Sequence, residues 1–330
     1  MNENQRALTL SDATLGCLLG ACVGDAAGAV LEFREPPSPA DVAWAMTMPG
    51  GGVWGVAPGQ ITDDSELMLC LAQALAESPT FGLERIARHY AAWIDSPPFD
   101  IGTTTSRSLG AVHGIPASYA ATMTQAAARH CVESKSNGSL MRATPLGVWG
   151  RRLSPDELAD CARQDSCLSH PNPSCWQAVA CYSIAIAHLL NHLGDRQGAF
   201  AAAQRWARVN ANAEVQSWLT DAEQNRLIPY TPQIGFVRIG FTHAFRHLWL
   251  GTDFVAALAE TLAGGGDTDT NACIVGGLLG AAYGAEAIPL SMRQAVLTCD
   301  TAKGRVRPAF LHTKQIPALV TKMLTIVGES

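Results

Sequence analysis

The sequence lacks the features that mark several large classes of protein. Its charged fraction is only 16% and its formal net charge is −6, so no basic excess is available for a nucleic-acid backbone or an anionic membrane surface. No stretch of about 18 residues is both apolar and uncharged, as a membrane span requires. The apolar run 272–283 is too short and too rich in glycine. Neither nucleic acid nor a membrane is therefore an expected partner.

Targeting signals and thiolate metal motifs are also missing. Residues 1–16 have neither the basic start nor the apolar run of a secretory signal, so we expect a cytoplasmic protein. The ten cysteines include no CxxC pair, so a zinc ribbon has no support. Most cysteines lie in apolar runs, where we expect buried free thiols: Cys17, Cys22, Cys70, Cys181 and Cys273.

The pattern of apolar residues is helical. Alternation typical of β-strands is scarce, and apolar positions recur at helical spacing. One helix is expected to begin near Asp63, one to follow Pro173 and one to span 106–112. Others are expected over 12–24, 83–94, 121–132, 155–163, 198–208, 214–225, 235–249, 253–263 and 271–283. With 48% hydrophobic residues and no repeat or linker, the sequence predicts one compact all-α domain over 1–330.

The segments between these helices hold nearly all of the distinctive polar residues. They are rich in glycine, proline and polar side chains, which favours loops. The expected loops are 34–60, 95–106, 133–145, 166–174 and 264–270.

Two acidic clusters, 62–64 and 267–270, lie about two hundred residues apart, each at the start of an expected helix. Threonine or aspartate at a helix start is commonly an N-cap. A cap needs one acceptor, however, and neighbouring carboxylates repel unless a cation is close. Neither cluster has a lysine or arginine nearby, and its hard oxygen donors suit Mg²⁺ or Mn²⁺. If the two helix starts converge, the clusters would hold two cations.

Four further candidates are ambiguous from their residue types alone. Segment 137–142 contains a glycine turn that could cradle phosphate, although an ordinary turn is the simpler interpretation. Asp100 either caps the helix over 106–112 or acts as an acid or base. Glu32 ends an apolar run and is either exposed or buried with a raised pKa. His170 is by itself typical of a loop histidine.

Several motifs follow one another along nearly the whole chain: GACVGDAAGAVLEF (20–33), ITDDS (61–65), FDIGTTT (99–105), SNGSLMR (136–142), SHP (169–171) and GGDTDTNA (265–272). In this order they resemble the ADP-ribosylglycohydrolases, and within them the bacterial enzymes that remove ADP-ribose from arginine of dinitrogenase reductase. The last motif is highly specific.

The resemblance implies an all-helical domain with a cleft that binds two Mg²⁺ or Mn²⁺ ions. Glu32 matches a glutamate beside the metals, and Asp100 matches a loop aspartate that meets the substrate. The implied metal ligands are Thr62, Asp63, Asp64, Asp267, Asp269 and Thr270. The implied substrate-binding residues are Gly102, Thr103, Asn137, Gly138, Ser139 and His170.

The implied activity is hydrolysis of the N-glycosidic bond between ADP-ribose and a protein side chain, with arginine as the first choice. Thr103 stands where the arginine-specific bacterial enzymes usually carry asparagine, and Ser136 stands where glycine is usual. A serine, nucleobase or O-acetyl-ADP-ribose linkage is therefore an alternative. So is a non-catalytic ADP-ribose-binding or toxin-immunity protein, although the complete set of oxygen ligands favours an enzyme. The expected partners are ADP-ribose and an ADP-ribosylated protein.

Overall fold

The computed structural model describes residues 7–34, 36–112, 118–326 and 328. These residues form helices and loops, and the only extended pairings among them are two isolated bridges, Gly51 with Val56 and Ser136 with Phe236. The all-α prediction is confirmed.

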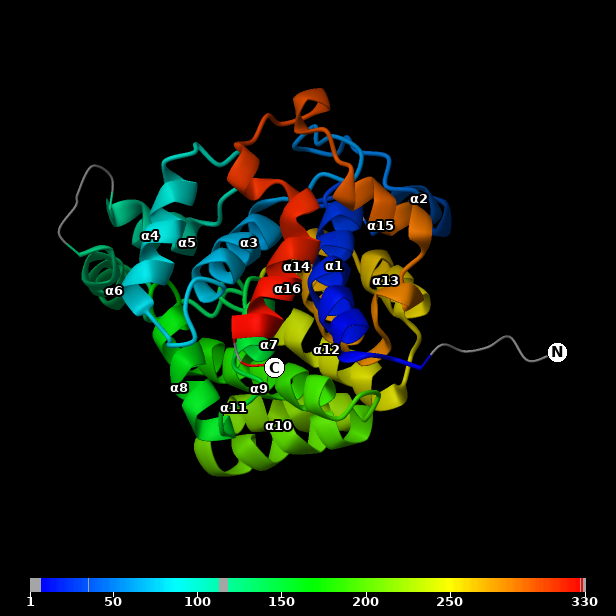
Figure 1. Ribbon diagram of the computed structural model, residues 1–330. Helices are drawn as coiled ribbons and strands as arrows, with labels where there is room; N and C mark the ends of the chain where they lie inside the picture. The colour runs from blue at the N-terminus through cyan, green and yellow to red at the C-terminus, as the bar shows by residue number, and fades with distance from the viewer. Residues whose placement is uncertain (1–6, 35, 113–117, 327, 329–330) are drawn as a thin grey trace.

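The α-helices and their order are shown in Figure 1. They are α1 (Leu10–Gly28), α2 (Pro39–Ala45), α3 (Asp63–Leu75), α4 (Leu83–Ile94), α5 (Thr103–Leu109), α6 (Tyr119–His130), α7 (Thr144–Trp149), α8 (Pro155–Ser166), α9 (Pro173–Asn191), α10 (Arg196–Asn210), α11 (Ala213–Glu223), α12 (Val237–Leu250), α13 (Phe254–Ala263), α14 (Thr268–Tyr283), α15 (Leu290–Leu297) and α16 (Ile316–Ile326). Five short 3-10 turns complete the described helical structure: η1 (Gly110–Val112), η2 (Ala285–Ala287), η3 (Thr301–Lys303), η4 (Ala309–Leu311) and η5 (Thr313–Gln315).

The first helix and the fourteenth pack together at the centre of the molecule. Glycines recur at every fourth position along the contacting face of α1, at 16, 20, 24 and 28. A Cβ atom at Gly20 would overlap the carbonyl oxygen of Gly276, and a Cβ at Gly24 would overlap that of Ala272. Close backbone approach therefore requires glycine along this face. It brings the end of α1 beside the start of α14, where the Thr268 hydroxyl donates to the Gly28 carbonyl at 2.7 Å.

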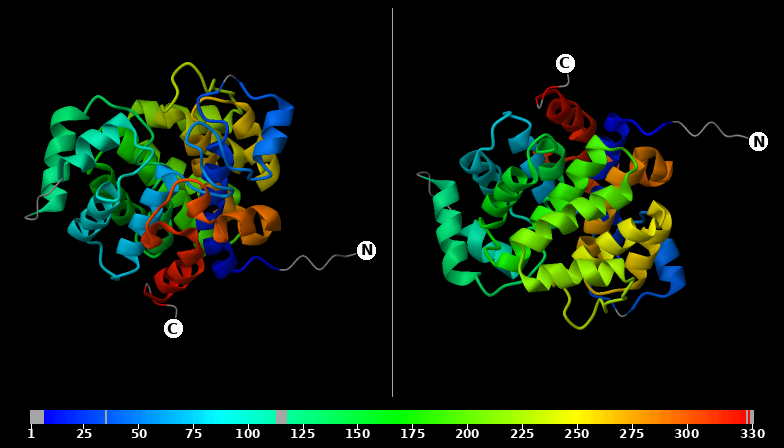
Figure 2. Two further views of the ribbon diagram at one scale, coloured as in Figure 1. Left: turned by 90° about the horizontal axis from the view of Figure 1, so that it is seen from above. Right: turned by 90° about the horizontal axis from the view of Figure 1, so that it is seen from below.

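The other helices surround this central pair. Figure 1 shows α8 to α11, in green, below it, and α4 to α6, in cyan, on one side. The views from above and below keep α4 to α6 together on that side and α13 on the opposite side (Figure 2). One hydrophobic cluster of buried residues includes members from α1 to α16.

The central helix also has the composition of a membrane span. By length and hydropathy, α1 is the one helix in the described part of the chain that could cross a membrane, with 19 residues and a mean hydropathy of 1.2 over its window. In the fold, 78% of that window is buried inside the protein. The apolar surface of α1 is thus covered by the neighbouring core helices.

The structure corrects several predicted boundaries. The expected loop 34–60 contains α2, which begins with a capping box in which Ser38 and Asp41 each bond the backbone of the other. The helix expected over 106–112 begins instead at Thr103, and its N-cap is Gly102. Asp100 lies before that cap, so the interpretation of Asp100 as the helix cap is wrong. Three helices, α7, α15 and α16, lie in regions where no helix was predicted.

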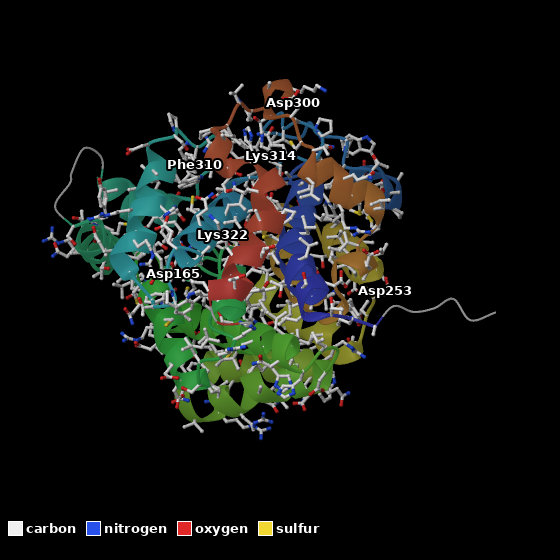
Figure 3. The ribbon with its side chains drawn as sticks, viewed as in Figure 1. Asp165, Asp253, Asp300, Phe310, Lys314 and Lys322 are labelled. Atoms are coloured by element: carbon white, nitrogen blue, oxygen red, sulfur yellow. The ribbon has the colours of Figure 1, made fainter. Side chains whose placement is uncertain are left out.

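The C-terminal segment, residues 305–326, contains η4, η5 and α16 and contacts α3. Figure 3 labels Phe310, Lys314 and Lys322 along this segment. The Phe310 carbonyl accepts a hydrogen bond of 2.5 Å from the Gln73 amide on α3. All ten cysteines are free, and the five that were expected to be buried are buried.

Candidate functional site

A cavity of about 420 Å³ opens where α1, α3, α5 and α14 come together. Of the fourteen site residues predicted from the sequence, eleven line it: Glu32, Asp63, Asp100, Gly102, Thr103, Asn137, Gly138, His170, Asp267, Asp269 and Thr270. The other three, Thr62, Asp64 and Ser139, are buried outside this lining. The fold therefore brings segments 32, 62–64, 100–105, 136–141 and 267–270 into one site.

Asp25 connects α1 to the first acidic cluster and was not predicted as a site residue. Its carboxylate accepts hydrogen bonds from the Thr62 amide at 2.9 and 3.1 Å and from the Ser65 amide at 3.0 Å. These amides belong to the start of α3, so Asp25 caps α3 from another helix. The signal in the sequence was a carboxylate in the last turn of a largely apolar helix, where another segment must satisfy it once it is buried.

Neither acidic cluster serves to cap its own helix. Thr62 occupies the N-cap position of α3, yet its hydroxyl lies 2.9 Å from Asp25 Oδ1 and 3.0 Å from Asp64 Oδ2, and it makes no cap bond. Asp267 occupies the N-cap position of α14 and also makes no side-chain cap bond. Its Oδ2 accepts instead from the side-chain amide of Asn137 at 2.7 Å. The capping interpretation is therefore wrong for both clusters.

The carboxylates converge on Asp269. Its oxygens lie within 4.8 Å of those of Asp25 and Asp64 in one group, and of Glu32 and Asp100 in a second. Burial, reinforced by the neighbouring carboxylates, raises the pKa of Asp100 to about 8. Burial likewise raises the pKa of Asp64 and of Asp269 well above the ordinary value. Such shifts are expected where like charges are buried together without a cation.

The donor set fits divalent cations. No lysine or arginine is among the cavity-lining residues, so no side chain there offsets the negative charge. Asp64 Oδ1 is buried and has no hydrogen-bond partner. A buried acceptor without a partner is costly. Carboxylate and hydroxyl oxygens are the ligands that Mg²⁺ and Mn²⁺ prefer, so a cation at this position would satisfy both demands.

Glu32 is buried and held by a tryptophan. Only 4% of its surface is exposed, so the exposed alternative is wrong. Trp54 Nε1 donates to Glu32 Oε2 at 2.5 Å. Burial is the main reason that the pKa of Glu32 rises to about 7. Trp54, which also lines the cavity, was not predicted as a site residue because it belongs to a loop without any recognised motif.

The loop around Asn137 is fixed by pairing with the start of α12. The backbone amide of Asn137 donates to the Gly235 carbonyl at 3.0 Å, and the backbone amide of Val237 donates to the Lys135 carbonyl at 2.9 Å. At Gly138, a Cβ atom would lie 2.8 Å from the His170 ring. Glycine is therefore needed where this loop passes the histidine.

His170 is a buried wall of the cavity. Its Nδ1 lies 2.8 Å from the Ser169 hydroxyl and its Nε2 lies 2.9 Å from the Ser136 hydroxyl. Burial, with a smaller contribution from nearby Arg142, lowers its pKa to about 3. The imidazole is therefore neutral at physiological pH. The serine that departs from the family pattern, Ser136, is a direct partner of this ring.

Arg142 and Ser139 support the loop from behind. Arg142 pairs with Asp165 at 3.2 Å and donates to the Gly138 carbonyl at 3.2 Å, with no exposed surface. Asp165, on α8, is labelled in Figure 3. Ser139 accepts from the Ser166 hydroxyl at 2.9 Å. The guanidinium of Arg142 is therefore paired with a carboxylate and supports the loop, rather than facing the cavity.

Comparison with known proteins gives a consistent result. A sequence model of the family "ADP-ribosylglycohydrolase" matches residues 6–319. The chain is 30% identical over 285 residues to the ADP-ribosyl-[dinitrogen reductase] glycohydrolase of Rhodospirillum rubrum, covering 85% of this chain and 89% of that one. It is 28% identical over 307 residues to the ADP-ribosylarginine hydrolase Tri1 of Pseudomonas putida, covering 86% and 75%.

A solved structure supports the fold. The chain superimposes on an ADP-ribosylglycohydrolase-related protein complex with a TM-score of 0.75 at 22% identity, over 97% of this chain and 99% of that chain. The similarity extends across nearly the whole of both chains.

Proposed function

Because the chain belongs to the ADP-ribosylglycohydrolase family, we propose that it hydrolyses the N-glycosidic bond between ADP-ribose and an arginine side chain of a modified protein. The observation that carries this proposal is the convergence of buried carboxylates on Asp269 in a cavity without cationic side chains. A core cluster that includes residues from both ends of the described chain supports one domain over 1–330.

The site would hold two Mg²⁺ or Mn²⁺ ions, which supply Lewis acidity and bind hydroxyl groups of the substrate. We assign the ligands as Thr62, Asp63, Asp64, Asp267, Asp269 and Thr270. Asp25 is better suited to organising α3, because its oxygens already accept bonds from the Thr62 and Ser65 amides. The unpartnered Asp64 Oδ1 supports an ion on that side of the cluster.

ADP-ribose would be bound by the loops that face the carboxylates. We assign Gly102 and Thr103 at the start of α5, the Asn137–Ser139 loop and His170 to this role. The neutral ring of His170 offers an apolar face and no net charge, and backbone amides at loops and helix starts can bind phosphate oxygens without a lysine. The hydrogen bond from Asn137 to Asp267 would keep the substrate loop in register with the metal site.

Glu32 and Asp100 are the proposed proton carriers. Their carboxyl groups are buried beside Asp269, with pKa values raised to about 7 and about 8 before any cation is bound. General acid–base groups work best when their pKa lies near the operating pH. Asp100 would protonate the leaving nitrogen or the ribose ring oxygen, and Glu32 would orient or deprotonate water. The surrounding carboxylates would stabilise the positive charge that develops on the ribose.

The preference for arginine rests on charge and on the relatives. A guanidinium leaving group is cationic, and a cavity lined by five carboxylates and no lysine or arginine favours it over a neutral acceptor. The names of two relatives refer to arginine or to dinitrogen reductase. Thr103 and Ser136, the two departures from the arginine-specific pattern, both line the cavity and are where a different acceptor would be accommodated.

The test is release of free ADP-ribose by the purified protein from an arginine-ADP-ribosylated protein, with Mg²⁺, with Mn²⁺ and with EDTA. A serine-linked substrate is assayed in parallel. We expect release from the arginine-linked substrate that requires the metal. Release from the serine-linked substrate alone would change the proposed acceptor from arginine to serine and leave the proposed metal site unchanged. No release from either substrate would contradict the proposed reaction.

A further inference from the structure

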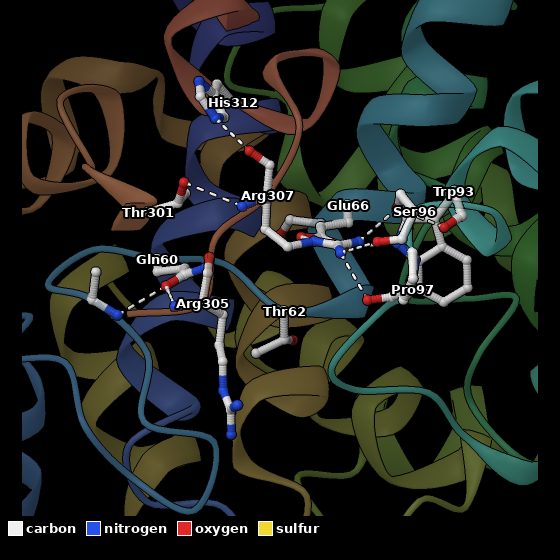
Figure 4. A network of polar contacts seen from close by, with 12 residues as sticks. Gln60, Thr62, Glu66, Trp93, Ser96, Pro97, Thr301, Arg305, Arg307 and His312 are labelled. Atoms are coloured by element: carbon white, nitrogen blue, oxygen red, sulfur yellow. Dashed lines mark hydrogen bonds and ion pairs between the residues drawn. The ribbon is translucent and has the colours of Figure 1, made fainter. Parts of the chain in front are cut away.

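Arg307 is buried in the C-terminal segment and uses every donor of its guanidinium group. Its Nε and Nη2 donate to the two oxygens of Glu66 at 2.7 and 2.8 Å. Nη1 donates to the carbonyls of Ser96 and Pro97 at 2.5 and 3.0 Å, and Nη2 also reaches the Ser96 hydroxyl at 2.9 Å. Figure 4 shows this network, in which Arg307 lies between Glu66 and the Ser96–Pro97 backbone.

These contacts join the two parts of the site that must meet. Glu66 is in the first turn of α3, immediately after the acidic cluster, and accepts a further bond of 2.7 Å from Trp93. Ser96 and Pro97 lead through a second proline to Asp100. The two proline rings restrict the backbone dihedral angles, so fixing the backbone at Ser96 and Pro97 also limits where Asp100 can lie. Arg307 therefore connects the helix of the metal ligands to the loop of Asp100.

The Asp100 side chain has little else to fix it. No hydrogen bond to its carboxylate is found among the described residues, although its oxygens lie close to those of Glu32 and Asp269. The preceding residue, Phe99, lies under Arg307, with 5.9 Å between the guanidinium carbon and the ring centroid. The backbone carbonyls and the Phe99 ring are thus the points through which the position of Asp100 is determined.

The neighbouring Arg305 makes a similar connection to Glu32. Its Nε donates to the Trp54 carbonyl, and the Trp54 indole donates to Glu32. Gln60 holds the backbone of Arg305 on both sides, donating to its carbonyl at 2.6 Å and accepting from its amide at 3.0 Å. One segment of the C-terminal region therefore reaches both proposed proton carriers.

We propose that Arg307, through Glu66 and the Ser96–Pro97 carbonyls, is a positioning residue that sets Asp100 against Asp269 for the reaction. This inference rests on the proposed function. Lysine cannot replace the planar fork that bonds a carboxylate and two carbonyls at once, so Arg307→Lys should keep the buried charge and lose the geometry. A displacement of about 1 Å in a reacting group is enough to reduce turnover by about a hundredfold.

The experiment compares Arg307→Lys and Arg307→Met with Arg246→Met. Arg246 is also largely buried and paired, with Glu260 at 2.6 Å, but it lies on α12 and does not line the cavity. Each folded variant is assayed for kcat and KM, and its crystal structure is determined. We expect kcat to fall about 10- to 100-fold in both Arg307 variants, with KM changed less than about threefold. The Arg246 variant should lose stability alone.

The crystal structures separate this proposal from the proposed function. In the Arg307 variants, the Asp100 carboxylate should move out of the group that it forms with Glu32 and Asp269, and in the Arg246 variant it should stay. An unmoved Asp100 in Arg307→Lys and Arg307→Met overturns the positioning role, whatever the activity. An inactive wild-type protein contradicts the proposed function and leaves the structural comparison valid.

Discussion

Asp64 is the residue whose environment makes the strongest demand for a cation. One of its oxygens is buried without a hydrogen-bond partner, and its nearest charged neighbours are other carboxylates. The same charge is therefore unfavourable when the site is empty and favourable when an ion is bound.

Asp64→Asn should separate these two effects. In EDTA the variant should melt at a higher temperature than the wild type, because asparagine has no carboxyl group whose ionisation is opposed by burial in the fold. In Mg²⁺ that advantage should disappear, and turnover should fall at least about a hundredfold because a ligand is lost. The measurements are thermal melting with and without metal and the ADP-ribose release assay.

Asp253→Asn is the matched control, because Asp253 caps α13 with a 2.9 Å bond to the Ala256 amide, and asparagine caps equally well. Asp253, labelled in Figure 3, precedes α13 and does not line the cavity. If Asp64→Asn behaved like Asp253→Asn in both conditions, the metal assignment at Asp64 would be wrong.

Single residues were predictable from the sequence where a motif carried them. The two acidic clusters contain several carboxylates and no basic residue, so their unusual charge could be recognised without a structure. Asp25 lies within the motif 20–33 but had no predicted role, and Trp54 lies outside the motifs, since each acts on a residue of a different segment. Arg307 lies 241 residues from its partner Glu66, and nothing in the local sequence indicates that pairing.

At the level of the helices, the glycine face of α1 decides where the site residues lie. The backbone of α1 approaches that of α14 closely because α1 has glycine at each contact, as at Gly20 opposite Gly276 and Gly24 opposite Ala272. Asp25 lies in the last turn of α1 and Glu32 lies just after that helix, whereas Asp269 lies in the first turn of α14. Their separation therefore depends on this helix contact.

Gly20→Ala should force the two helices apart. Insertion of a methyl group against a backbone carbonyl in a tightly packed core costs about 1–3 kcal/mol or more. We expect a lower free energy of unfolding in denaturant and weaker Mn²⁺ binding by calorimetry, because Asp25 and Asp269 move relative to one another.

Gly110→Ala provides the control. A Cβ atom at Gly110 meets nothing within 4 Å, and this residue has an ordinary right-handed backbone with φ of −66°. It should leave both measurements unchanged within error. Equal behaviour of the two alanine variants would show that the α1–α14 contact tolerates a side chain and does not set the site.

Helix existence was easier to predict than helix boundaries. The helices α4 and α13, with 12 and 10 residues, have a regular apolar period, and they were predicted with nearly their observed ends. α2 and α7 have only 7 and 6 residues, too few for a period to appear. α2 had another signal, the serine and aspartate of its capping box. α5 begins earlier than expected because Gly102 has no side chain that signals a helix start.

For the molecule as a whole, the buried ionisable groups predict how stability depends on pH. Folded-state pKa values of Glu32 and Asp100 are raised to about 7 and about 8, so their contribution to stability is present at low pH and is lost as pH rises through those values. The pKa values of the buried histidines are lowered, to about 4 for His243 and His247 and to about 3 for His170. These histidines therefore increase the stability of the fold as pH rises, and that increase ends near pH 6.5, the ordinary histidine pKa.

Between pH 6.5 and 8.5 the carboxyl groups with raised pKa therefore lower the stability of the metal-free protein as pH rises. In EDTA the free energy of unfolding should fall across this range by about 1.4 kcal/mol per pH unit for each carboxyl group that stays protonated in the fold. The melting temperature should fall with it. In saturating Mg²⁺ the fall should be much smaller, because the cations stabilise the ionised carboxylates. Thermal scans at three pH values check both statements. A melting temperature in EDTA that did not change over this range would contradict the burial of uncompensated charge.

The contact between α1 and α14 also has a consequence for synthesis of the protein. The bond between Thr268 and Gly28 joins residues 240 positions apart, so α1 leaves the ribosome long before its main packing partner exists. At 5–20 residues per second the interval is roughly 10 to 50 s. During that time the nascent chain lacks the partner that covers α1, a helix as apolar as a membrane span, so this surface can be buried in its final contact only after translation passes the last acidic motif.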